Sequence, residues 1–329
     1  MKRNARIIST AMYAPERVVT NQYFNEMLGK DVNTWLVENL TIRERRWCAE
    51  DESTADLAYQ AGKKAIEKAD LKPEDLDLII IATDTPEYIS PSTASVVQDR
   101  LGAAGAGTFD VNTACAGFVT IVDMAAKYIR SDEQYNNVLV IGAYAMSKYL
   151  NKNDKKTVTL FADGAGAAIL QNTNENRGFL GSLLHTEGQY HDWMGIYGGG
   201  TKLPVSDETI RNNDHLLKFV KKFPSEINPT TWTNMISELV NNQGLSPKDI
   251  NMVFLTQINI NSIRETMDNL NLSMEQTHTI MDRYGYTGSA CIPMALSEAV
   301  DQGKVRDNDL VVFMGSGGGL AFAAAAFRW

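Results

Sequence analysis

Cys115 is the residue whose type and setting could do chemistry on its own. It lies in "DVNTACAGFVT", between a run that predicts a strand and apolar residues at helical spacing. A helix N-terminus carries roughly +0.5 elementary charge, which favours the nucleophilic thiolate form of cysteine. The neighbours Ala114, Ala116 and Gly117 are small enough to let a substrate approach the sulfur. We therefore predict that Cys115 is a nucleophile, although a lone cysteine is more often an inert core residue.

Cys48 and Cys291 are the other two cysteines, and we interpret both as buried and inert. An odd number of widely separated cysteines makes neither a disulfide framework nor the spacing of a metal site. We therefore predict that the protein holds no metal. A reducing, cytoplasmic location is the simplest expectation for such cysteines.

The bulk composition excludes several function classes. The 329 residues are 44% hydrophobic and 22% charged, which is usual for a soluble globular protein. The net charge of −9 argues against non-specific binding of nucleic acid and against a basic membrane-binding face. No apolar run approaches the length of a membrane span, and "MKRNARIIST" lacks the apolar core of a signal peptide.

An internal repeat predicts the architecture. "LKPEDLDLIIIATD" (71–84) and "LSPKDINMVFLTQI" (245–258) share a Leu, Pro and Asp turn that leads into an apolar run. A helix and two further strands rich in small residues follow each copy, in the same order. We therefore predict an α/β protein with two similar halves, 1–174 and 175–329, whose small residues let the layers pack closely. Between the repeats, 198–215 is predicted to be a surface insertion and 215–240 to be mostly helical.

Several motifs together carry a family resemblance. "FDVNTACAGF" resembles the nucleophile segment of β-ketoacyl-ACP synthase III, the initiating condensing enzyme of fatty-acid synthesis, and "WLVENLTIRERRW" resembles its N-terminal substrate-binding segment. "LFADGAGAAIL" and "GSGGGLAF" also match. The resemblance implies the thiolase fold, with two βαβαβαββ halves in five alternating layers. It also implies a homodimer, although a heterodimer is an open alternative.

The resemblance assigns further active-site residues, two of which depart from the family. The oxyanion donors would be the backbone N–H groups of Cys115 and Gly318. The family's catalytic His lies in a "PHQAN"-like segment, which is "LTQININ" here, with Gln257 interpreted as standing at the His position. Its catalytic Asn lies in a "GNT"-like segment, where this chain has Tyr286. The four histidines, at positions 185, 191, 215 and 278, all lie outside the expected segment.

These exchanges change the chemistry that we expect. The amide of Gln257 and the hydroxyl of Tyr286 can donate hydrogen bonds, but glutamine cannot act as a general base. Glu87, in the loop "TDTPEYISPS", is one candidate for a replacement base, because some branches of the family use a glutamate from this loop. In the same loop Ser90 stands where the resemblance implies a bulky aromatic residue, which predicts room for a longer or branched acyl chain.

The resemblance also implies how a donor binds. Trp35 matches a tryptophan that stacks on the adenine of coenzyme A, and Lys155 stands where an arginine contacts the same molecule, whereas Asn39 replaces a second arginine. Acyl-CoA or an acyl carrier protein is therefore the expected donor, with no permanently bound cofactor. The basic stretch "KNDKK" (152–156) could supply part of the docking surface for a carrier protein.

Three functions remain open at this point. The first is an acyltransferase or condensing enzyme that loads an acyl group onto Cys115 and passes it to a carbon, amine or hydroxyl acceptor other than malonyl-ACP, in fatty-acid-like or secondary-metabolite biosynthesis. The second is a decarboxylating synthase in which Gln257 and Tyr286 act as donors. The third is a non-catalytic subunit of a heteromeric synthase.

Overall fold

The structure is a computed structural model that describes residues 3–329. Its larger sheet has five strands, in the order β1 (Asn4–Tyr13), β7 (Asp163–Thr173), β6 (Asn137–Ala145), β4 (Leu78–Ala82) and β5 (Gly107–Val111). The second sheet has four, in the order β11 (Met252–Leu255), β12 (Leu310–Gly317), β13 (Ala321–Arg328) and β8 (Gly178–Thr186). The apolar runs of the sequence repeat become β4 and β11, whose residues are all buried.

The two sheets have the same connectivity. In the larger sheet, β1 pairs antiparallel with β7, β7 pairs antiparallel with β6, and β6 pairs parallel with β4. In the second sheet, β8, β13, β12 and β11 pair in the same way and in the same order. The counterpart of β5 in the second sheet is a single parallel bridge between Thr277 and Val253. The prediction of a duplicated α/β architecture is therefore confirmed. The boundary between residues 174 and 175 stays a prediction, and it falls in the connection between β7 and β8.

The helices and the remaining short strands complete the layers. The helices are α1 (Asn21–Leu28), α2 (Asn33–Leu40), α3 (Thr54–Lys68), α4 (Thr93–Leu101), α5 (Gly117–Ser131), α6 (Lys155–Val158), α7 (Asp207–Arg211), α8 (Ile227–Asn241), α9 (Ile260–Asn269), α10 (Met281–Tyr284) and α11 (Cys291–Asp301). The short strands pair as β2 (Val18–Thr20) with β3 (Glu44–Arg46), and as β9 (Met194–Gly195) with β10 (Lys218–Phe219).

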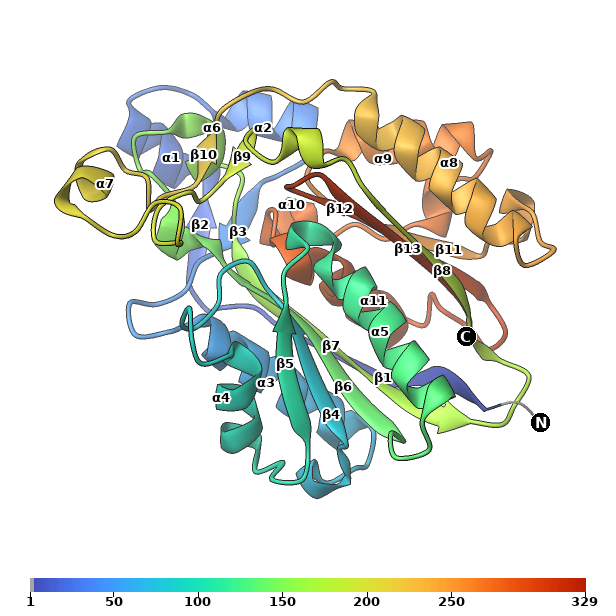
Figure 1. The fold of residues 1–329 in the computed structure, drawn as a ribbon. Helices are drawn as coiled ribbons and strands as arrows, with labels where there is room; N and C mark the ends of the chain where they lie inside the picture. The colour runs from blue at the N-terminus through green and yellow to red at the C-terminus, as the bar shows by residue number, and fades with distance from the viewer. Residues whose placement is uncertain (1–2) are drawn as a thin grey trace.

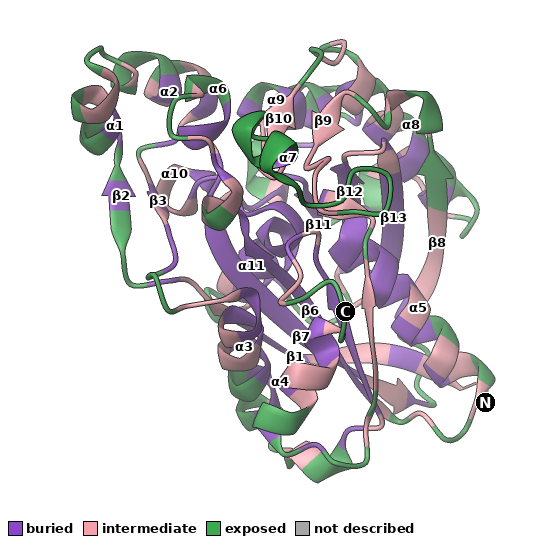
Figure 2. Cartoon of the chain, turned by 60° about the vertical axis from the view of Figure 1, so that its left-hand side comes forward, coloured by how far each residue is buried: buried purple, intermediate pink, exposed green. Residues whose placement is uncertain are grey.

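The layers alternate as predicted. Figure 1 shows α3 and α4 outside the larger sheet, α5 and α11 between the two sheets, and α8 and α9 outside the second sheet. Helix α5 contacts both sheets, through β6 on one side and β13 on the other. Figure 2 shows that the centre of the molecule, with β6, β7 and α11, is buried. The five layers therefore enclose two buried central helices whose N-terminal ends are available to a shared site.

The turns and small residues explain how the layers form. Asp75 and Asp249 occupy the same place in the two repeat turns, where their carboxylates accept hydrogen bonds from the backbone N–H of Lys72 (2.8 Å) and Ser246 (2.7 Å). A Cβ at Gly166 of β7 would lie 2.6 Å from the backbone nitrogen of Met294, so only glycine allows α11 to approach this closely. The predicted tight packing of small residues is thus confirmed.

The region between the repeats is only partly as predicted. The insertion 198–215 is largely exposed and contains only α7. The helical prediction for 215–240 is wrong for residues 215–226, because the backbone here pairs with β9 and Val220 donates to the carbonyl of Trp193 at 2.8 Å. The proline at 224 also disfavours helical geometry at the residue before it. Helix α8 begins only at Ile227.

Candidate active site

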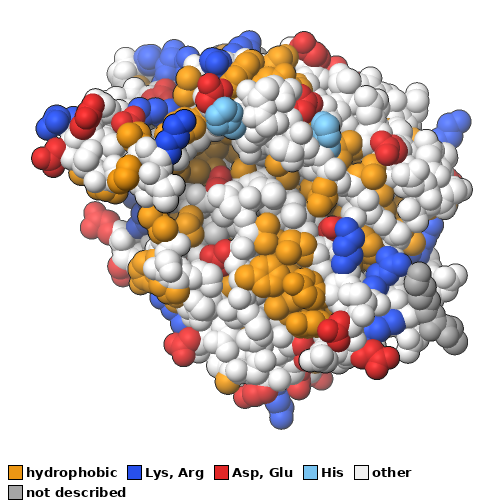
Figure 3. All heavy atoms as spheres, in the orientation of Figure 1, with side chains coloured by type: hydrophobic (Ala, Val, Ile, Leu, Met, Phe, Trp, Pro, Cys, Tyr) orange, Lys and Arg blue, Asp and Glu red, His pale blue; other side chains and the backbone are white. Residues whose placement is uncertain are grey.

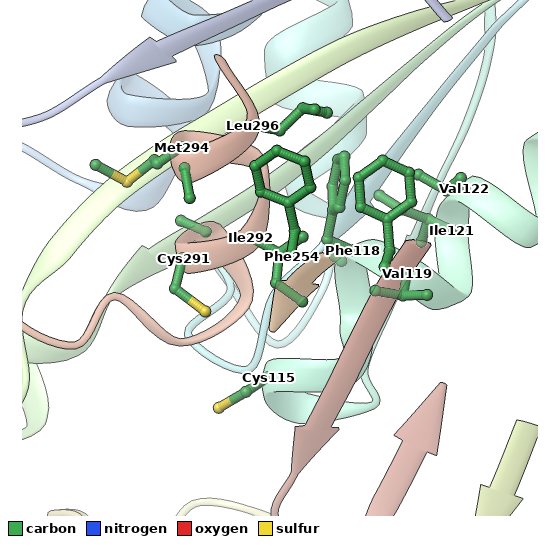
Figure 4. Close-up of a cluster of buried hydrophobic side chains, with 14 of the residues drawn as sticks. Cys115, Phe118, Val119, Ile121, Val122, Phe254, Cys291, Ile292, Met294 and Leu296 are labelled. Carbon is green, nitrogen blue, oxygen red and sulfur yellow. The ribbon is translucent and has the colours of Figure 1, made fainter. Parts of the chain in front are cut away.

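Cys115 lies in a sharp turn that joins β5 to α5, as predicted. Ala114, the residue before it, has a φ of 46°, and its N–H donates to the Asn112 side chain at 3.0 Å. A short 3-10 turn over Ala114–Ala116 then leads into α5 at Gly117. This left-handed backbone conformation is costly for alanine. It makes the turn that places Cys115 just before the first residue of α5. Figure 4 shows the sulfur pointing away from the apolar cluster around Phe118 and Phe254.

The end of β12 holds the backbone of this turn in place. A Cβ at Gly317 would lie 2.3 Å from the backbone nitrogen of Cys115, so this strand can pass the nucleophile only as glycine. Gly318, the next residue, lines both cavities that Cys115 lines. The glycine loop and the nucleophile, about two hundred residues apart in the chain, are thus brought together as predicted.

Two cavities meet at Cys115. We call the smaller one, of about 270 Å³, the inner cavity; its lining includes Asp84, Tyr144, His191 and Tyr197. We call the larger one, of about 410 Å³, the apolar cavity; its lining includes Leu160, Phe223, Ile258 and Leu320. Cys115, Met194 and Gly318 line both. Although Cys115 is only 2% exposed, it therefore borders both cavities.

A third hollow, which we call the entrance, connects the apolar cavity with the surface. It has a volume of about 650 Å³ and shares Trp35, Leu160, Phe219 and Lys222 with the apolar cavity. Trp35, which is 55% exposed, and Lys155 both line it. The two residues predicted to bind a donor therefore lie together, at the mouth of a passage that leads to Cys115.

The entrance carries a local positive charge on a protein that is acidic as a whole. Five lysines line it, one after the C-terminus of α1, two in α6 and two in the segment after β10: Lys30, Lys155, Lys156, Lys221 and Lys222. Asp31 is the one acidic residue among the described residues of this lining. Such a cluster attracts anionic groups, phosphates among them. Sequence reasoning found only part of it, because the two lysine pairs are 66 positions apart.

The electrostatics of Cys115 differ from the prediction. Burial raises the pKa of the Cys115 thiol well above its usual value, and the nearby Asp84 raises it further. The Tyr286 hydroxyl donates a hydrogen bond to the sulfur, which lowers the pKa. The expectation of a thiol held ionised by the helix end is therefore wrong for the free protein, because desolvation outweighs the partial charge of the helix.

Asp84 is a site residue that sequence reasoning missed. It follows β4 and lines the inner cavity together with Cys115. Its Oδ1 atom is buried and has no hydrogen-bond partner among residues 3–329, and burial raises the pKa of this carboxyl to about 6. A signal was available, because β4 and β5 are parallel neighbours and residues that follow such strands meet at one edge of the sheet.

The described part of the chain shows neither a metal-binding cluster nor a membrane-spanning helix. Within residues 3–329, no cluster of three or more His, Cys, Asp and Glu side chains has the arrangement of a metal site. The same part of the chain contains no helix that is both long enough and apolar enough to cross a membrane.

Comparison with known sequences identifies the family. Residues 109–188 match the family described as 3-oxoacyl-[acyl-carrier-protein] synthase III, and residues 240–329 match its C-terminal region. The β-ketoacyl-[acyl-carrier-protein] synthase III of Symbiobacterium thermophilum is 39% identical over 331 residues, which cover 99% of this chain and 98% of that protein. The protein of the same name from Clostridioides difficile is 38% identical, with 100% and 99% covered.

Comparison with solved structures agrees. The crystal structure of 3-oxoacyl-[acyl-carrier-protein] synthase III from Aquifex aeolicus has a TM-score of 0.89 and 32% sequence identity, and the match covers 99% of this chain and 100% of that one. This chain belongs to the β-ketoacyl-ACP synthase III family. The thiolase fold is thereby confirmed, and a condensing function of the ketosynthase III type is supported.

Gln257 does not lie in the active site of this synthase III relative. The residue is 1% exposed and lines none of the three hollows. Its side-chain amide bonds to the backbone of a neighbouring segment: Nε2 donates to the His278 carbonyl at 2.9 Å, and Oε1 accepts from the Ile280 N–H at 2.8 Å. The interpretation of Gln257 as a substitute donor is therefore wrong. Its amide bonds to backbone and cannot also reach a substrate beside Cys115.

Thr256 is the residue at the histidine position. When the Gln and Asn of the "PHQAN"-like segment are placed on Gln257 and Asn259, the histidine falls on Thr256. The Thr256 hydroxyl accepts from the N–H of Ser316 at 2.9 Å, which ties the end of β11 to the end of β12. A threonine cannot act as a base at neutral pH, so on this alignment the absence of the family's imidazole stays a prediction, now at Thr256 instead of Gln257.

Tyr286, Glu87 and Ser90 have different outcomes. Tyr286 lines the apolar cavity beside Cys115, and its backbone is fixed by bonds to Leu160 (2.9 Å) and Ala162 (2.9 Å). Glu87 lines none of the described hollows. Its carboxylate accepts from the Ala55 N–H at 2.9 Å in the first turn of α3, so within this subunit it acts as a cap and not as a base. Ser90 is exposed in the same loop.

Cys48 and Cys291 agree with their predicted structural roles, and one of the four histidines lies at the site. Cys48 and Cys291 are buried and line none of the three hollows. His278 bonds to Glu298 at 2.8 Å, His185 is exposed, and His215 does not begin a helix. His191, by contrast, lies at the rim of the inner cavity.

Proposed function

We propose that this chain is an acyltransferase that takes an acyl group from a coenzyme A or carrier-protein thioester onto Cys115 and passes it to an acceptor other than malonyl-ACP. The observation that supports this most directly is the sulfur itself. It lies where the passage from the entrance meets the inner cavity, with a hydroxyl donor beside it and no imidazole on the described lining other than that of His191 at the rim.

The first step is a thiol–thioester exchange. The phosphates of the donor bind the entrance lysines, and its adenine or a carrier-protein surface rests against Trp35. The Cys115 sulfur attacks the thioester carbonyl, while the N–H groups of Cys115 and Gly318 are the proposed donors to the oxygen that becomes negative. The proton of the thiol leaves with the departing thiol of the donor, so an acyl-Cys115 and a free CoA or carrier thiol are formed.

The second step sets this chain apart from a decarboxylating synthase. Decarboxylation of a malonyl thioester leaves an enolate that needs hydrogen-bond donors. Tyr286 can supply one, but Gln257 cannot supply a second, because its amide is bound to the backbone. An acceptor that is already acidic, or an amine, needs less help. It attacks the acyl carbonyl, and Cys115 leaves as the thiol.

A decarboxylating function remains the second candidate, because one donor is retained. A purely structural subunit is disfavoured, since an open passage to a buried sulfur has no use in a protein that only shapes a partner.

The sheet edge supports a homodimer. β5 is an edge strand of the larger sheet, and Figure 3 shows hydrophobic side chains gathered over β5 and α5. Phe109 and Val111 of β5 are only partly buried. An exposed edge strand with apolar side chains favours pairing with another copy. Sedimentation analysis of wild type and Val111→Lys tests this: a dimer that Val111→Lys weakens is expected, and a wild-type monomer contradicts it.

Intact-protein mass spectrometry with a panel of acyl-CoA and acyl-ACP donors tests the catalytic proposal. Wild type and Cys291→Ala are expected to gain one acyl mass, whereas Cys115→Ala gains none. Cys291 is the matched control because it too is a buried cysteine at the start of a helix. Carbon, amine and hydroxyl acceptors are then added to the acylated protein. Consumption of malonyl-ACP with release of CO₂ would favour the decarboxylating function, and the absence of acylation by every donor would contradict both catalytic functions.

A further inference from the structure

Asp84 is a partly buried carboxylate with one oxygen that is buried and has no partner among residues 3–329, and no step of the proposed reaction uses it. Its Oδ1 atom is out of contact with solvent and accepts no hydrogen bond from any residue in 3–329. Buried polar atoms are normally paired, since an unpaired one loses its bonds to water and gains nothing in return. A carboxylate is the most costly case. The position therefore suggests a partner that arrives with a ligand.

The surroundings of Asp84 offer no cation. Among residues 3–329, neither lysine nor arginine lines the inner cavity. The titratable groups that face this space or influence Asp84 are the thiol of Cys115, the phenols of Tyr144, Tyr149 and Tyr197, and the imidazole of His191 at the rim. Cys115 and Tyr144 have pKa values well above their usual range, so both are neutral at physiological pH. The carboxylate of Asp84 is thus the one carboxylate among the described residues that line this cavity.

The position of the cavity indicates which part of the substrate reaches it. The apolar cavity connects with the entrance through Trp35, Leu160 and Phe219, so it receives the long arm of the donor. The inner cavity shares Cys115, Met194 and Gly318 with the apolar cavity but has no lining residue in common with the entrance. It is therefore the space into which an acyl group projects once it is bound to the sulfur.

We propose that the inner cavity selects an acyl group that carries a hydrogen-bond donor, an ammonium or a hydroxyl, a few bonds from the thioester carbonyl, and that Asp84 accepts this donor. The proposal rests on the proposed acylation of Cys115 and adds the chemical class of the acyl group. A purely hydrocarbon chain in the same place would leave the carboxylate unpaired and would be disfavoured.

Three CoA thioesters of similar size test the proposal: butyryl-CoA, 3-hydroxybutyryl-CoA and 3-aminobutyryl-CoA. The rate of Cys115 acylation is followed by intact mass and by release of CoA. Wild type is expected to acylate with at least one of the two polar donors about tenfold or more faster than with butyryl-CoA, which is the effect of one hydrogen bond to a charged group. Comparison of the two polar donors shows whether ammonium or hydroxyl is the natural group.

Two variants show whether Asp84 is the cause. Asp84→Leu is expected to reverse the order, with butyryl-CoA becoming the best donor. Asp84→Asn, which keeps an acceptor oxygen but no charge, is expected to lose the preference for the ammonium and to keep part of that for the hydroxyl. Glu87→Gln is the matched control, since this carboxylate of the same loop caps α3, and its donor preference should be that of wild type. Thermal melting confirms that each variant is folded.

The outcomes separate this proposal from the proposed function. Acylation of wild type by butyryl-CoA at the rate of the polar donors, or an unchanged preference in a folded Asp84→Asn and Asp84→Leu, overturns the role of Asp84 while acylation of Cys115 stands. Failure of all three donors, and of the wider panel, overturns the proposed function and this proposal with it.

Discussion

Tyr286→Phe isolates the hydrogen bond that the second half of the chain gives to the nucleophile. The hydroxyl donates to the Cys115 sulfur and thereby lowers a pKa that burial has raised. Phenylalanine fills the same space and keeps the ring contact with Phe161, whose centroid is 5.4 Å away. The backbone bonds of residue 286 do not involve the side chain, so the fold should be kept.

The size of the effect follows from the charge of the acceptor. A hydrogen bond to a charged group contributes about 1.5–3 kcal/mol. At about 1.4 kcal/mol for each pKa unit, its loss raises the pKa of Cys115 by roughly one to two units. Since only the thiolate reacts, and its fraction falls as the pKa rises, the variant should react about ten to a hundred times more slowly at any pH below the pKa.

Alkylation with iodoacetamide measures this directly. The rate at Cys115 is resolved from those at Cys48 and Cys291 by mass spectrometry of peptides, at several pH values. Tyr149→Phe is the matched control, because this phenol is half-buried and influenced by the same Asp84 but is not a hydrogen-bond donor to Cys115. A wild-type rate in Tyr286→Phe, or the same slowing in Tyr149→Phe, would refute the reasoning that the Tyr286 hydroxyl stabilises the thiolate.

Three further predictions concern the surroundings of the site. Gly317→Ala places a Cβ 2.3 Å from the Cys115 nitrogen, so we expect the free energy of unfolding to fall by roughly 1–3 kcal/mol on urea denaturation. We also expect no acylation of this variant by intact mass. An alanine variant as stable and active as wild type would contradict the close contact. Gln257→His breaks two buried hydrogen bonds, and we expect a loss of about 1–3 kcal/mol on urea denaturation with no gain in CO₂ release from malonyl-ACP. Lys155→Glu with Lys222→Glu should raise the KM for an acyl carrier protein about tenfold at low salt and much less at high salt; a salt-independent effect would argue against the charge of the entrance.

The sequence was most informative where local patterns determine the structure. The turn before β4 and the turn before β11 were predicted because Pro and Asp fix such turns by bonds within a few residues. The position of Cys115 was predicted because a strand signal and a helix signal meet there. Small residues in β7 predicted close packing, since only a neighbouring layer explains their number.

Long-range geometry accounts for what was missed. Gln257 and Thr256 are adjacent, and their side chains bond to different segments at the end of β11, so a shift of one position moved the alignment with the family's histidine from Thr256 to Gln257. Residues 215–226 have helical composition, but pairing with β9 and the aromatic contacts of Phe223 with Phe219 and with Trp193 override it. Asp84 reaches the cavity only because β4 and β5 lie side by side.

The paired turns at the centre of the molecule have a consequence for how the enzyme can change. Ala114, before the nucleophile, has a φ of 46°, and Gly288, at the same place in the other repeat, has a φ of 49°. The first repeat contributes Cys115, and the second contributes the Tyr286 hydroxyl and Gly317, so neither repeat contains a complete centre. Helices α5 and α11 pack against both sheets. Substitutions at these contacts, although far from every cavity, can therefore change the reaction rate by moving Cys115 relative to Tyr286.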